Sequence, residues 1–333
     1  MRHPNHARTT SRGPRAIVSQ WVPICPAYTL KQRHTTRPKR VTLHDTTHLA
    51  VFWDTASDKP AAVADTCRHR GASLSVGRVV DGCVRCAYHD RPTKPRRDRT
   101  IVKDGIVWYF DHTFTDTTSG GPAAGTTQAI PHGSWEFHDP QQRTYTYTRD
   151  FPGCNAMYMM ENTLDWSHLE HIHAFSFTTG DPRVVIHSDY VASYIYEDTN
   201  LPDTVLEVEN EWWDTWNTCL RFKVGKKNSD DDAPPEMQHQ FSLHFAFVPN
   251  GKDGCTIIVR VVRQCLNWTG TMGDVMLMLS NELPLREDRD IVRTIPGDRK
   301  WRDDRLGKED AFLRRFRTHM KSNYPALVSY YTG

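Results

Sequence analysis

No apolar run in this sequence approaches the roughly 18 residues that a membrane-spanning helix needs, and no secretory signal is present. The net charge of +2 gives no reason to expect a nucleic-acid partner. The composition, with 38% hydrophobic and 25% charged residues, is compatible with a soluble globular protein, and 333 residues suggest two domains. Eight cysteines in a chain of this length favour a reducing compartment over a disulfide scaffold, so we expect a cytoplasmic location.

Acidic residues are missing from the start of the chain, where Asp45 is the first. The basic residues that precede it are Arg2, Arg8, Arg12, Arg15, Lys31, Arg33, Arg37, Lys39 and Arg40. We expect residues 1–20 to be a basic flexible tail. The alternative is an organelle transit peptide, for which an Arg-rich and acid-poor start is typical.

The distribution of residues predicts an α+β protein with two domains, at 21–115 and 129–333. The first is β-rich, with strands expected at Val41–Phe52 and Gly105–Phe110, and with a basic, Pro-containing loop at Arg91–Arg99 that fits no regular element. The stretch 116–128 is rich in Thr, Gly and Ala and is expected to be the linker between the domains.

The second domain combines alternating strands with longer helices. Three segments are expected to be strands of one antiparallel sheet, namely Trp216–Val224, Phe241–Phe247 and Ile257–Arg263. Two segments are expected to be helices, namely Met272–Thr294, interrupted at Pro284, and Asp303–Ser322.

The chain contains two metal-type half-sites, Cys67-Arg68-His69 and Cys86-Ala87-Tyr88-His89, separated by sixteen residues. Two Cys and two His are the ligands of a Rieske [2Fe–2S] centre, in which two Cys hold one iron and two His hold the other. A structural zinc site uses the same residue types, and Cys83, which forms C-x-x-C with Cys86, adds to that alternative. The C-x-H spacing is tighter than the usual spacing of zinc ribbons and favours the cluster.

The flanking residues resemble the fingerprint of the Rieske family, C-x-H-R-G followed by C-x-Y-H. The resemblance implies that Cys67, His69, Cys86 and His89 bind the [2Fe–2S] cluster. The chain departs from the family after His89, where Asp90-Arg91-Pro92 replaces the usual Gly-Trp and aromatic residue. The basic loop that follows is a candidate docking site for an acidic electron donor.

A second cluster of metal-type residues lies in Glu161–His173, which has helical character. Three His within six residues suit a 2-His-1-carboxylate triad, which binds Fe(II) and leaves positions open for O₂ and substrate. On a regular helix His168 and His171 share a face, whereas His173 lies about 140° around the axis from His168. Geometry alone therefore favours His171 as the second ligand.

The same segment resembles the N-x-x-D-x-x-H-x₄-H motif of Rieske non-haem iron oxygenases, on which Asn162, Asp165, His168 and His173 match. The resemblance implies His168 and His173 as ligands and an irregular helix between them. It also places the third ligand in Leu285–Val292, where Asp288 is the first choice and Asp290 and Glu287 are alternatives.

The resemblance implies the terminal oxygenase (alpha) component of a ring-hydroxylating oxygenase. Its second domain would be a catalytic helix-grip, START-like domain. Electrons would pass from the Rieske cluster to a mononuclear Fe(II), and O₂ would hydroxylate or oxidatively demethylate a small organic substrate. No G-x-G-x-x-G fingerprint is present, so a separate ferredoxin or NAD(P)H-dependent reductase is expected.

In the same family the residue that matches Asp165 links a cluster His of one subunit to an iron His of the next. This implies a head-to-tail homotrimer, with the link running from His89 of a neighbour through Asp165 to His168. The alternatives are an electron-transfer protein without oxygenase activity and a zinc-stabilised binding protein.

The substrate pocket is expected between the sheet and the iron-binding helix. The candidate lining residues are Phe175, Phe177, Trp212, Trp213, Phe241, Phe245 and Phe247.

Overall fold

The computed structural model describes most of the chain. The described ranges are 21–32, 37–111, 113, 135–139, 142–173, 181–197, 203–214, 216–227, 235–264 and 270–332. The expected tail at 1–20, the expected linker at 116–128, and the pocket candidates Phe175 and Phe177 lie outside these ranges.

The N-terminal part contains three small antiparallel sheets of three strands each. The sheets are β1-β9-β8 (Trp21–Pro26, Ile106–Phe110, Thr100–Lys103), β2-β3-β4 (Lys39–Leu43, Thr47–Asp54, Lys59–Ala64) and β5-β6-β7 (Arg78–Val80, Cys83–Arg85, Pro92–Thr93). A short helix, α1 (Ala27–Lys31), follows β1.

Two expectations for this part need correction. The single strand predicted at Val41–Phe52 is a hairpin of β2 and β3, because His44 adopts a left-handed conformation with φ of 50° and turns the chain. The basic loop after His89 contains two short regular elements, β7 and a 3-10 turn, η1 (Arg97–Arg99).

The C-terminal part is built on one antiparallel sheet of seven strands, in the order β10-β16-β15-β14-β13-β12-β11. The strands are β10 (Gln142–Pro152), β11 (Arg183–Ile186), β12 (Val191–Tyr196), β13 (Thr204–Asp214), β14 (Asn217–Lys226), β15 (Gln238–Pro249) and β16 (Gly254–Gln264). The three strands expected from alternation are the long central strands β14, β15 and β16, so that prediction is confirmed.

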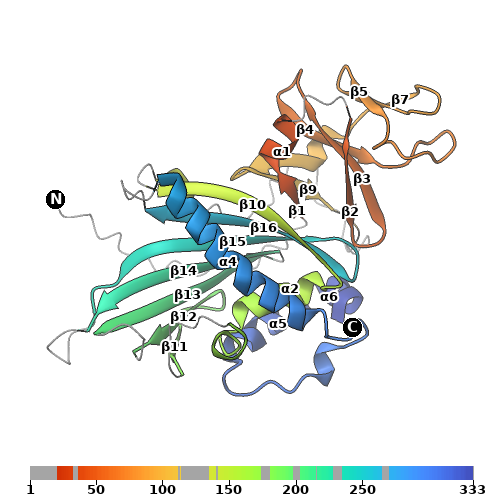
Figure 1. The fold of residues 1–333 in the computed structure, drawn as a ribbon. Helices are drawn as coiled ribbons and strands as arrows, with labels where there is room; N and C mark the ends of the chain where they lie inside the picture. The colour runs from red at the N-terminus through yellow and green to blue at the C-terminus, as the bar shows by residue number, and fades with distance from the viewer. Residues whose placement is uncertain are drawn as a thin grey trace.

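Helices cover one face of this sheet, and the long helix α4 runs across it (Figure 1). The helices are α2 (Ala156–Leu164), α3 (Leu169–Ile172), α4 (Gly270–Val292), α5 (Ala311–Asn323) and α6 (Pro325–Thr332). The helix predicted from Met272 is α4, but the expected interruption is wrong, because α4 runs through Pro284 as one continuous helix. The helix predicted at Asp303–Ser322 begins only at Ala311, after a 3-10 turn, η3 (Trp301–Asp303). The α+β fold class with a helix-covered antiparallel sheet is confirmed.

Two clusters of buried apolar side chains form the cores of the protein. The larger core runs from β1 and β9 into the seven-stranded sheet and its helices. A buried polar contact also joins the two ends of the chain, since His44 Nδ1 lies 2.6 Å from the hydroxyl of Tyr331 in α6. The smaller core lies beneath the first metal-type motif and includes Cys67 and Cys86. None of the helices in the described residues is long and apolar enough to span a membrane.

Candidate metal centres

The loop that carries the first half-site is closed by its own backbone. The Cys67 N–H donates to the Ala72 carbonyl at 2.8 Å, and the Gly71 N–H donates back to the Cys67 carbonyl at 2.8 Å. Gly71 has a φ of +76°, a conformation that glycine adopts without a steric cost. The sequence C-x-H-R-G therefore folds into a tight turn that presents the Cys and His side chains together.

The second half-site repeats this turn. The Cys86 N–H donates to the Arg91 carbonyl at 3.0 Å, and the Asp90 N–H donates to the Cys86 carbonyl at 2.8 Å. Asp90 takes the position that Gly71 has in the first loop and adopts a similar left-handed conformation, with a φ of 53°. Replacement of the usual Gly therefore leaves the backbone of the second loop like that of the first.

Two arginines hold the side chain of Asp90. Arg78 donates to its carboxylate at 2.9 Å and Arg85 at 3.0 Å. The hydrogen bond from Arg78 lowers the pKa of Asp90, so the carboxylate is ionised at neutral pH. Asp and Asn tolerate the left-handed conformation better than most other residues. The two arginine contacts hold the side chain of Asp90, which stands where the family usually has glycine.

The two loops bring the four predicted cluster ligands together. Cys67 and Cys86 are buried, whereas His69 and His89 are exposed, with ring centroids 4.7 Å apart. The N–H of His69 faces the Cys67 sulfur and lowers the pKa of its thiol, which favours the thiolate that binds metal. Two inner thiolates and two outer imidazoles fit a cluster whose His-bound iron lies toward the surface.

Cys83 does not join this group. It lies in β6, where it pairs with Val80, and it is only half-buried. Position 77, which packs against the end of β6, requires glycine, because a Cβ there would lie 2.1 Å from the Arg85 carbonyl oxygen.

The second motif spans two helices rather than one. α2 ends at Leu164, and Asp165 adopts an extended conformation. The Asp165 carboxylate accepts hydrogen bonds from the backbone N–H of Ser167 at 2.8 Å and from its hydroxyl at 2.7 Å. His168 then precedes the single turn of α3, and His173 follows it in an extended conformation.

This break brings His168 and His173 onto one side, facing Asp288 of α4. The Nε2 atom of His168 lies 3.5 Å from Asp288 Oδ1, and the Nε2 atom of His173 lies 3.6 Å from the same oxygen. One ligand atom from each of the three residues lies within 4.8 Å of the others. Burial raises the pKa of Asp288 and lowers that of His168, although the charge of Asp288 partly opposes the effect on His168.

The remaining candidate ligands lie elsewhere. His171 is exposed on α3. Asp290 is half-exposed and pairs with Arg289 at 2.9 Å. Glu287 lies behind the imidazole of His173, with its carboxylate 3.0 Å from Nδ1. The sequence presented Glu287 only as an alternative ligand, and its contact with the far side of His173 depends on how α4 packs.

Two further features of the motif acquire roles in the structure. Asn162 Nδ2 lies 3.5 Å from His168 Nε2, so Asn162 borders the site. Glu161 is buried in an ion pair with Arg317 of α5, at 2.6 and 2.8 Å, which joins two helices and leaves Glu161 away from the triad. Sequence reasoning missed Arg317, because it is one of several basic residues in an amphipathic helix.

The pocket candidates divide between the two faces of the sheet. Trp212 is fully buried on the helix side, against Phe316 of α5, and Phe241 stacks on Phe222 on that side at 4.5 Å. The prediction for Trp213 is wrong, because its ring stacks on His244 on the opposite face at 5.3 Å. The two tryptophans are neighbours on β13, and successive side chains of a strand point to opposite faces.

Parts of the chain resemble known proteins. The Rieske [2Fe-2S] domain family matches residues 20–94. The oxygenase subunit of vanillate O-demethylase from a Pseudomonas species is 28% identical over 138 residues, which are 38% of this chain and 41% of that protein. The chloroplastic chlorophyllide a oxygenase of Chlamydomonas reinhardtii is 28% identical over 153 residues, which are 40% and 21%. The matched region is thus less than half the length of these curated relatives.

Among solved structures, dicamba monooxygenase bound to dicamba superposes with a TM-score of 0.70 at 19% identity, over 92% of this chain and 97% of that one. Residues 20–94 thus form a domain of the Rieske [2Fe-2S] type, which contains both predicted cluster loops. The fold of the chain as a whole resembles that of dicamba monooxygenase.

Proposed function

We propose that the chain is a terminal oxygenase that uses its Rieske cluster and a mononuclear Fe(II) to hydroxylate or oxidatively demethylate a small organic substrate with O₂. The observation that carries this proposal is the buried group of His168, His173 and Asp288, present in the same chain as the Rieske loops. The donor set is a 2-His-1-carboxylate triad, which suits Fe(II) and leaves coordination positions open.

The residues of the triad fit a bound cation. Asp288 is 7% exposed, and within the described residues its Oδ1 atom accepts no hydrogen bond. A buried carboxylate is costly unless a positive charge compensates it. Burial lowers the pKa of His168, so its imidazole is neutral and available as a ligand at neutral pH.

When bound, the cluster would supply single electrons and the iron would activate O₂. The residues of the chain orient the ligands and exclude water. The Glu287 carboxylate accepts a hydrogen bond from the protonated Nδ1 of His173, which leaves the Nε2 lone pair directed at Asp288. Trp212, Phe245 and Phe247 are buried on the helix side of the sheet and provide an apolar surround.

Replacing Glu287 by Gln is expected to weaken Fe(II) binding by about tenfold, the lower end of the effect of losing a carboxylate behind a metal-bound His. Gln still accepts the hydrogen bond but removes the charge that makes the imidazole more basic. Titration of iron-depleted protein against a competing chelator measures the affinity. Asp290→Asn, on the exposed side of the same helix, is the matched control, and equal affinities in the two variants would contradict this role.

We infer that the working form is a head-to-tail homotrimer in which Asp165 links His168 to His89 of a neighbouring subunit. The arrangement within one chain supports this inference. The β5–β7 end of the Rieske domain, which carries the cluster loops, points away from the helices that carry the triad (Figure 1). His89 is exposed and is therefore accessible to a neighbour.

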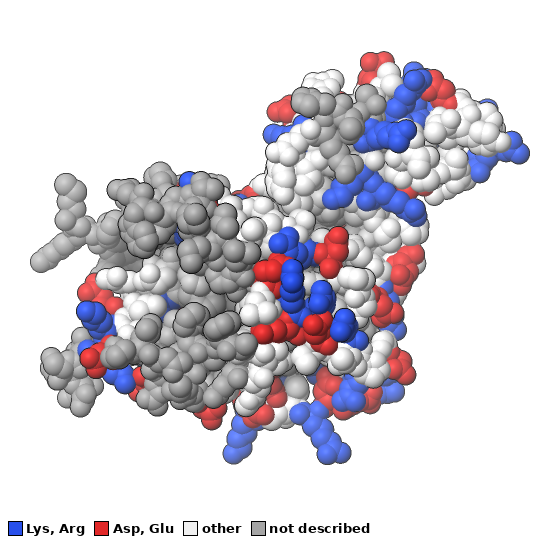
Figure 2. All heavy atoms as spheres, viewed as in Figure 1, with Lys and Arg blue, Asp and Glu red and all other residues white. Residues whose placement is uncertain are grey.

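The surface around the cluster supports an acidic redox partner, either a ferredoxin or the acidic face of a reductase. Figure 2 shows Lys and Arg gathered over the Rieske domain. A hollow of about 560 Å³ adjoins the second loop and is lined by Arg37, Arg78, Arg85, Tyr88 and His89 among others. Arg99 lies in the basic loop that the sequence predicted as the docking site. We leave it out of the docking surface, because it is partly buried and donates to the Tyr109 hydroxyl.

Neutralising Lys94 and Arg96 together, as Lys94→Gln and Arg96→Gln, is expected to slow reduction of the cluster by its donor about tenfold at low salt. Both side chains are exposed, so the fold and the cluster should be unaffected. Stopped-flow absorption of the cluster measures the rate. Arg302→Gln, equally exposed on the other part of the chain, serves as the control. A rate that is independent of both salt and these charges would exclude this surface.

The names of two of the relatives support a small aromatic substrate. The vanillate relative is named as an O-demethylase, and the dicamba enzyme as a monooxygenase, whose structure contains dicamba. Demethylation begins with hydroxylation of the methyl group, so one triad serves either outcome.

Measuring iron and acid-labile sulfide tests the proposed function. The oxygenase requires about three irons and two sulfides per chain. Two of each would indicate an electron-transfer protein without oxygenase activity, and no iron would indicate a zinc-stabilised binding protein. Turnover of methoxylated and hydroxylatable aromatic acids with a surrogate ferredoxin and reductase would then establish the activity.

A further inference from the structure

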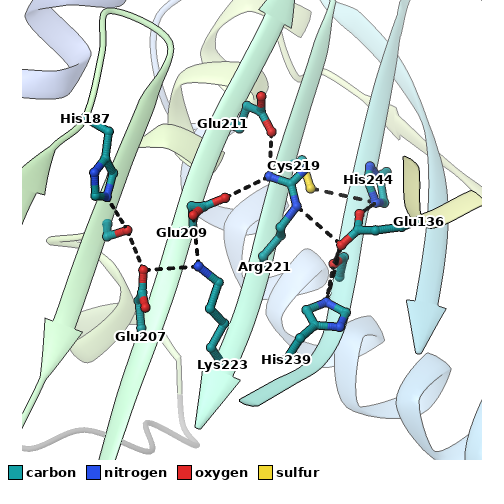
Figure 3. Close-up of polar contacts among 12 residues, drawn as sticks. Glu136, His187, Glu207, Glu209, Glu211, Cys219, Arg221, Lys223, His239 and His244 are labelled. Atoms are coloured by element: carbon teal, nitrogen blue, oxygen red, sulfur yellow. Dashed lines mark hydrogen bonds and ion pairs between the residues drawn. The ribbon is translucent and has the colours of Figure 1, made fainter. Parts of the chain in front are cut away.

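The face of the sheet turned away from α2 and α4 carries a layer of polar side chains, several of which are buried. They alternate along β13, β14 and β15 with the apolar side chains of the helix side. The labelled residues of this layer in Figure 3 are Glu136, His187, Glu207, Glu209, Glu211, Cys219, Arg221, Lys223, His239 and His244. None of them belongs to either metal centre described above.

Glu136 is at the centre of this layer. It comes from a 3-10 turn, η2 (Trp135–His138), and its side chain is completely buried. Its carboxylate accepts a hydrogen bond from the Ser242 hydroxyl at 2.6 Å and lies 2.9 Å from His244 Nε2 and 3.3 Å from Arg221 Nε. Glu136 therefore ties η2 to β14 and β15.

Three metal-type donors converge at this point, those of Glu136, Cys219 and His244, and His239 lies beside them, as the dashed contacts in Figure 3 show in part. His244 Nε2 lies 2.9 Å from Glu136 Oε2 and 3.8 Å from Cys219 Sγ, and His239 Nε2 lies 3.4 Å from Glu136 Oε1. Ligand atoms of Glu136, Cys219 and His244 all lie within 4.8 Å of one another. Neighbouring ligands around tetrahedral zinc lie about 3.3 Å apart for nitrogen and oxygen, and about 3.6 Å when one is sulfur.

A single proton on His244 links only two of these groups at a time. His244 Nε2 faces both the Glu136 carboxylate and the Cys219 sulfur, and one N–H can serve only one of them. The imidazole lies between the rings of Phe137 and Trp213, which restrict its orientation. A cation at the point where the donors meet would be shared by all of them.

The charge of the layer also favours a cation. Among the described residues of the network, the carboxylates of Glu136, Glu207, Glu209 and Glu211 outnumber the cations of Arg221 and Lys223 by two. Arg260 is the cross-strand neighbour of His244 and lies over the Phe137 ring at 3.5 Å.

We propose that Glu136, Cys219 and His244 form a structural zinc site, which His239 completes as the fourth ligand by moving toward the metal. The set of one thiolate, two imidazoles and one carboxylate matches the ligands that zinc uses in proteins. His239 Nε2 now lies 2.7 Å from the Ser242 hydroxyl, and zinc binding exchanges this contact for coordination. Ser242 and Arg221 stay on Oε1 of Glu136, while Oε2 binds the metal.

This site is closed, because all four positions are taken by protein groups, and it therefore has no place for substrate. Its expected effect is on the stability of the fold. Zinc would cross-link the turn at residues 135–138 to the two central strands of the sheet. Because such a metal binds the folded chain only, its removal should lower the melting temperature while both iron centres remain in place.

Zinc analysis and zinc K-edge X-ray absorption of the purified full-length protein test this proposal. The expected result is about one zinc per chain, with one sulfur among roughly four ligands. The sulfur distinguishes this site from zinc misloaded at the mononuclear centre, which has no cysteine, and from zinc at the Rieske loops, which would have two. Iron content is independent of this result, so failure here would leave the proposed oxygenase function standing.

Cys219→Ser is expected to reduce bound zinc about tenfold, whereas Cys255→Ser, equally buried but outside the network, should retain it. The visible spectrum of the Rieske cluster reports folding in both variants. No zinc in the wild-type protein, or the same zinc content in both variants, would overturn the site. If Cys219→Ser does not fold, the sulfur signal of the wild-type protein decides alone.

Discussion

Asp288→Ala is expected to abolish binding of the mononuclear iron and to lower turnover by more than about 100-fold, since the loss of a ligand exceeds the 10–100-fold typical of residues behind one. Asp288 is the single carboxylate facing both His168 Nε2 and His173 Nε2 in the described residues. The variant should keep its two cluster irons and its visible spectrum, because Cys67 and Cys86 lie in a separate apolar core.

Removing Asp288 also removes a buried negative charge, so the variant is expected to fold. Iron analysis and the EPR signal of the ferrous nitrosyl adduct measure the mononuclear site directly, without reliance on activity. Asp290→Ala is the matched control, because Asp290 lies two residues further on α4 and is half-exposed. Retention of the third iron in Asp288→Ala, or its loss in Asp290→Ala, would reassign the carboxylate ligand.

Asp165→Asn is expected to leave all metals bound and to slow reoxidation of the reduced cluster about 100-fold, in line with the loss of a carboxylate that links two metal-bound His. The asparagine keeps a side-chain oxygen, so it can still accept the two hydrogen bonds from Ser167 that end α2. The local turn is thereby preserved while the charge that would join His168 to the neighbouring subunit is lost.

Rapid mixing of the reduced protein with O₂ and substrate, followed at the cluster absorption, measures this rate. Ser167→Ala is the control, because it removes one of the local hydrogen bonds and leaves the carboxylate. Its rate should stay near that of the wild-type protein. Equal rates in Asp165→Asn and the wild-type protein would exclude the bridge and, with it, the functional reason for a trimer.

The cluster loops could be predicted almost completely from the sequence, because each is a local turn. Six consecutive residues, Cys67–Ala72, contain both backbone hydrogen bonds and the left-handed residue that close the first loop. The second loop obeys the same geometry even though Asp90 replaces glycine. The contacts from Arg78 and Arg85 that hold Asp90 come from two neighbouring strands, and their pairing was not visible in the sequence.

The choice between His171 and His173 needed more than helix geometry. A regular helix favours His171, and only the resemblance to a family motif indicated His173. The structure supplies the physical reason, since the Asp165 turn interrupts the helix and the extended backbone at His173 points the ring back toward α4. Glu287 acquired its contact with His173 in the same way, through packing of α3 against α4.

The sequence by itself determined the residue types and local turns of the Rieske loops, the strands that alternate around β14 to β16, and the order of the two metal motifs. Only the tertiary structure decided which carboxylate faces the two His, which of Trp212 and Trp213 lies on the helix side, and that Glu136 meets Cys219 and His244. The reason is physical. Short-range hydrogen bonds and periodicity act within a few residues, whereas these contacts join side chains 25 to 120 residues apart, whose meeting depends on strand register and helix packing.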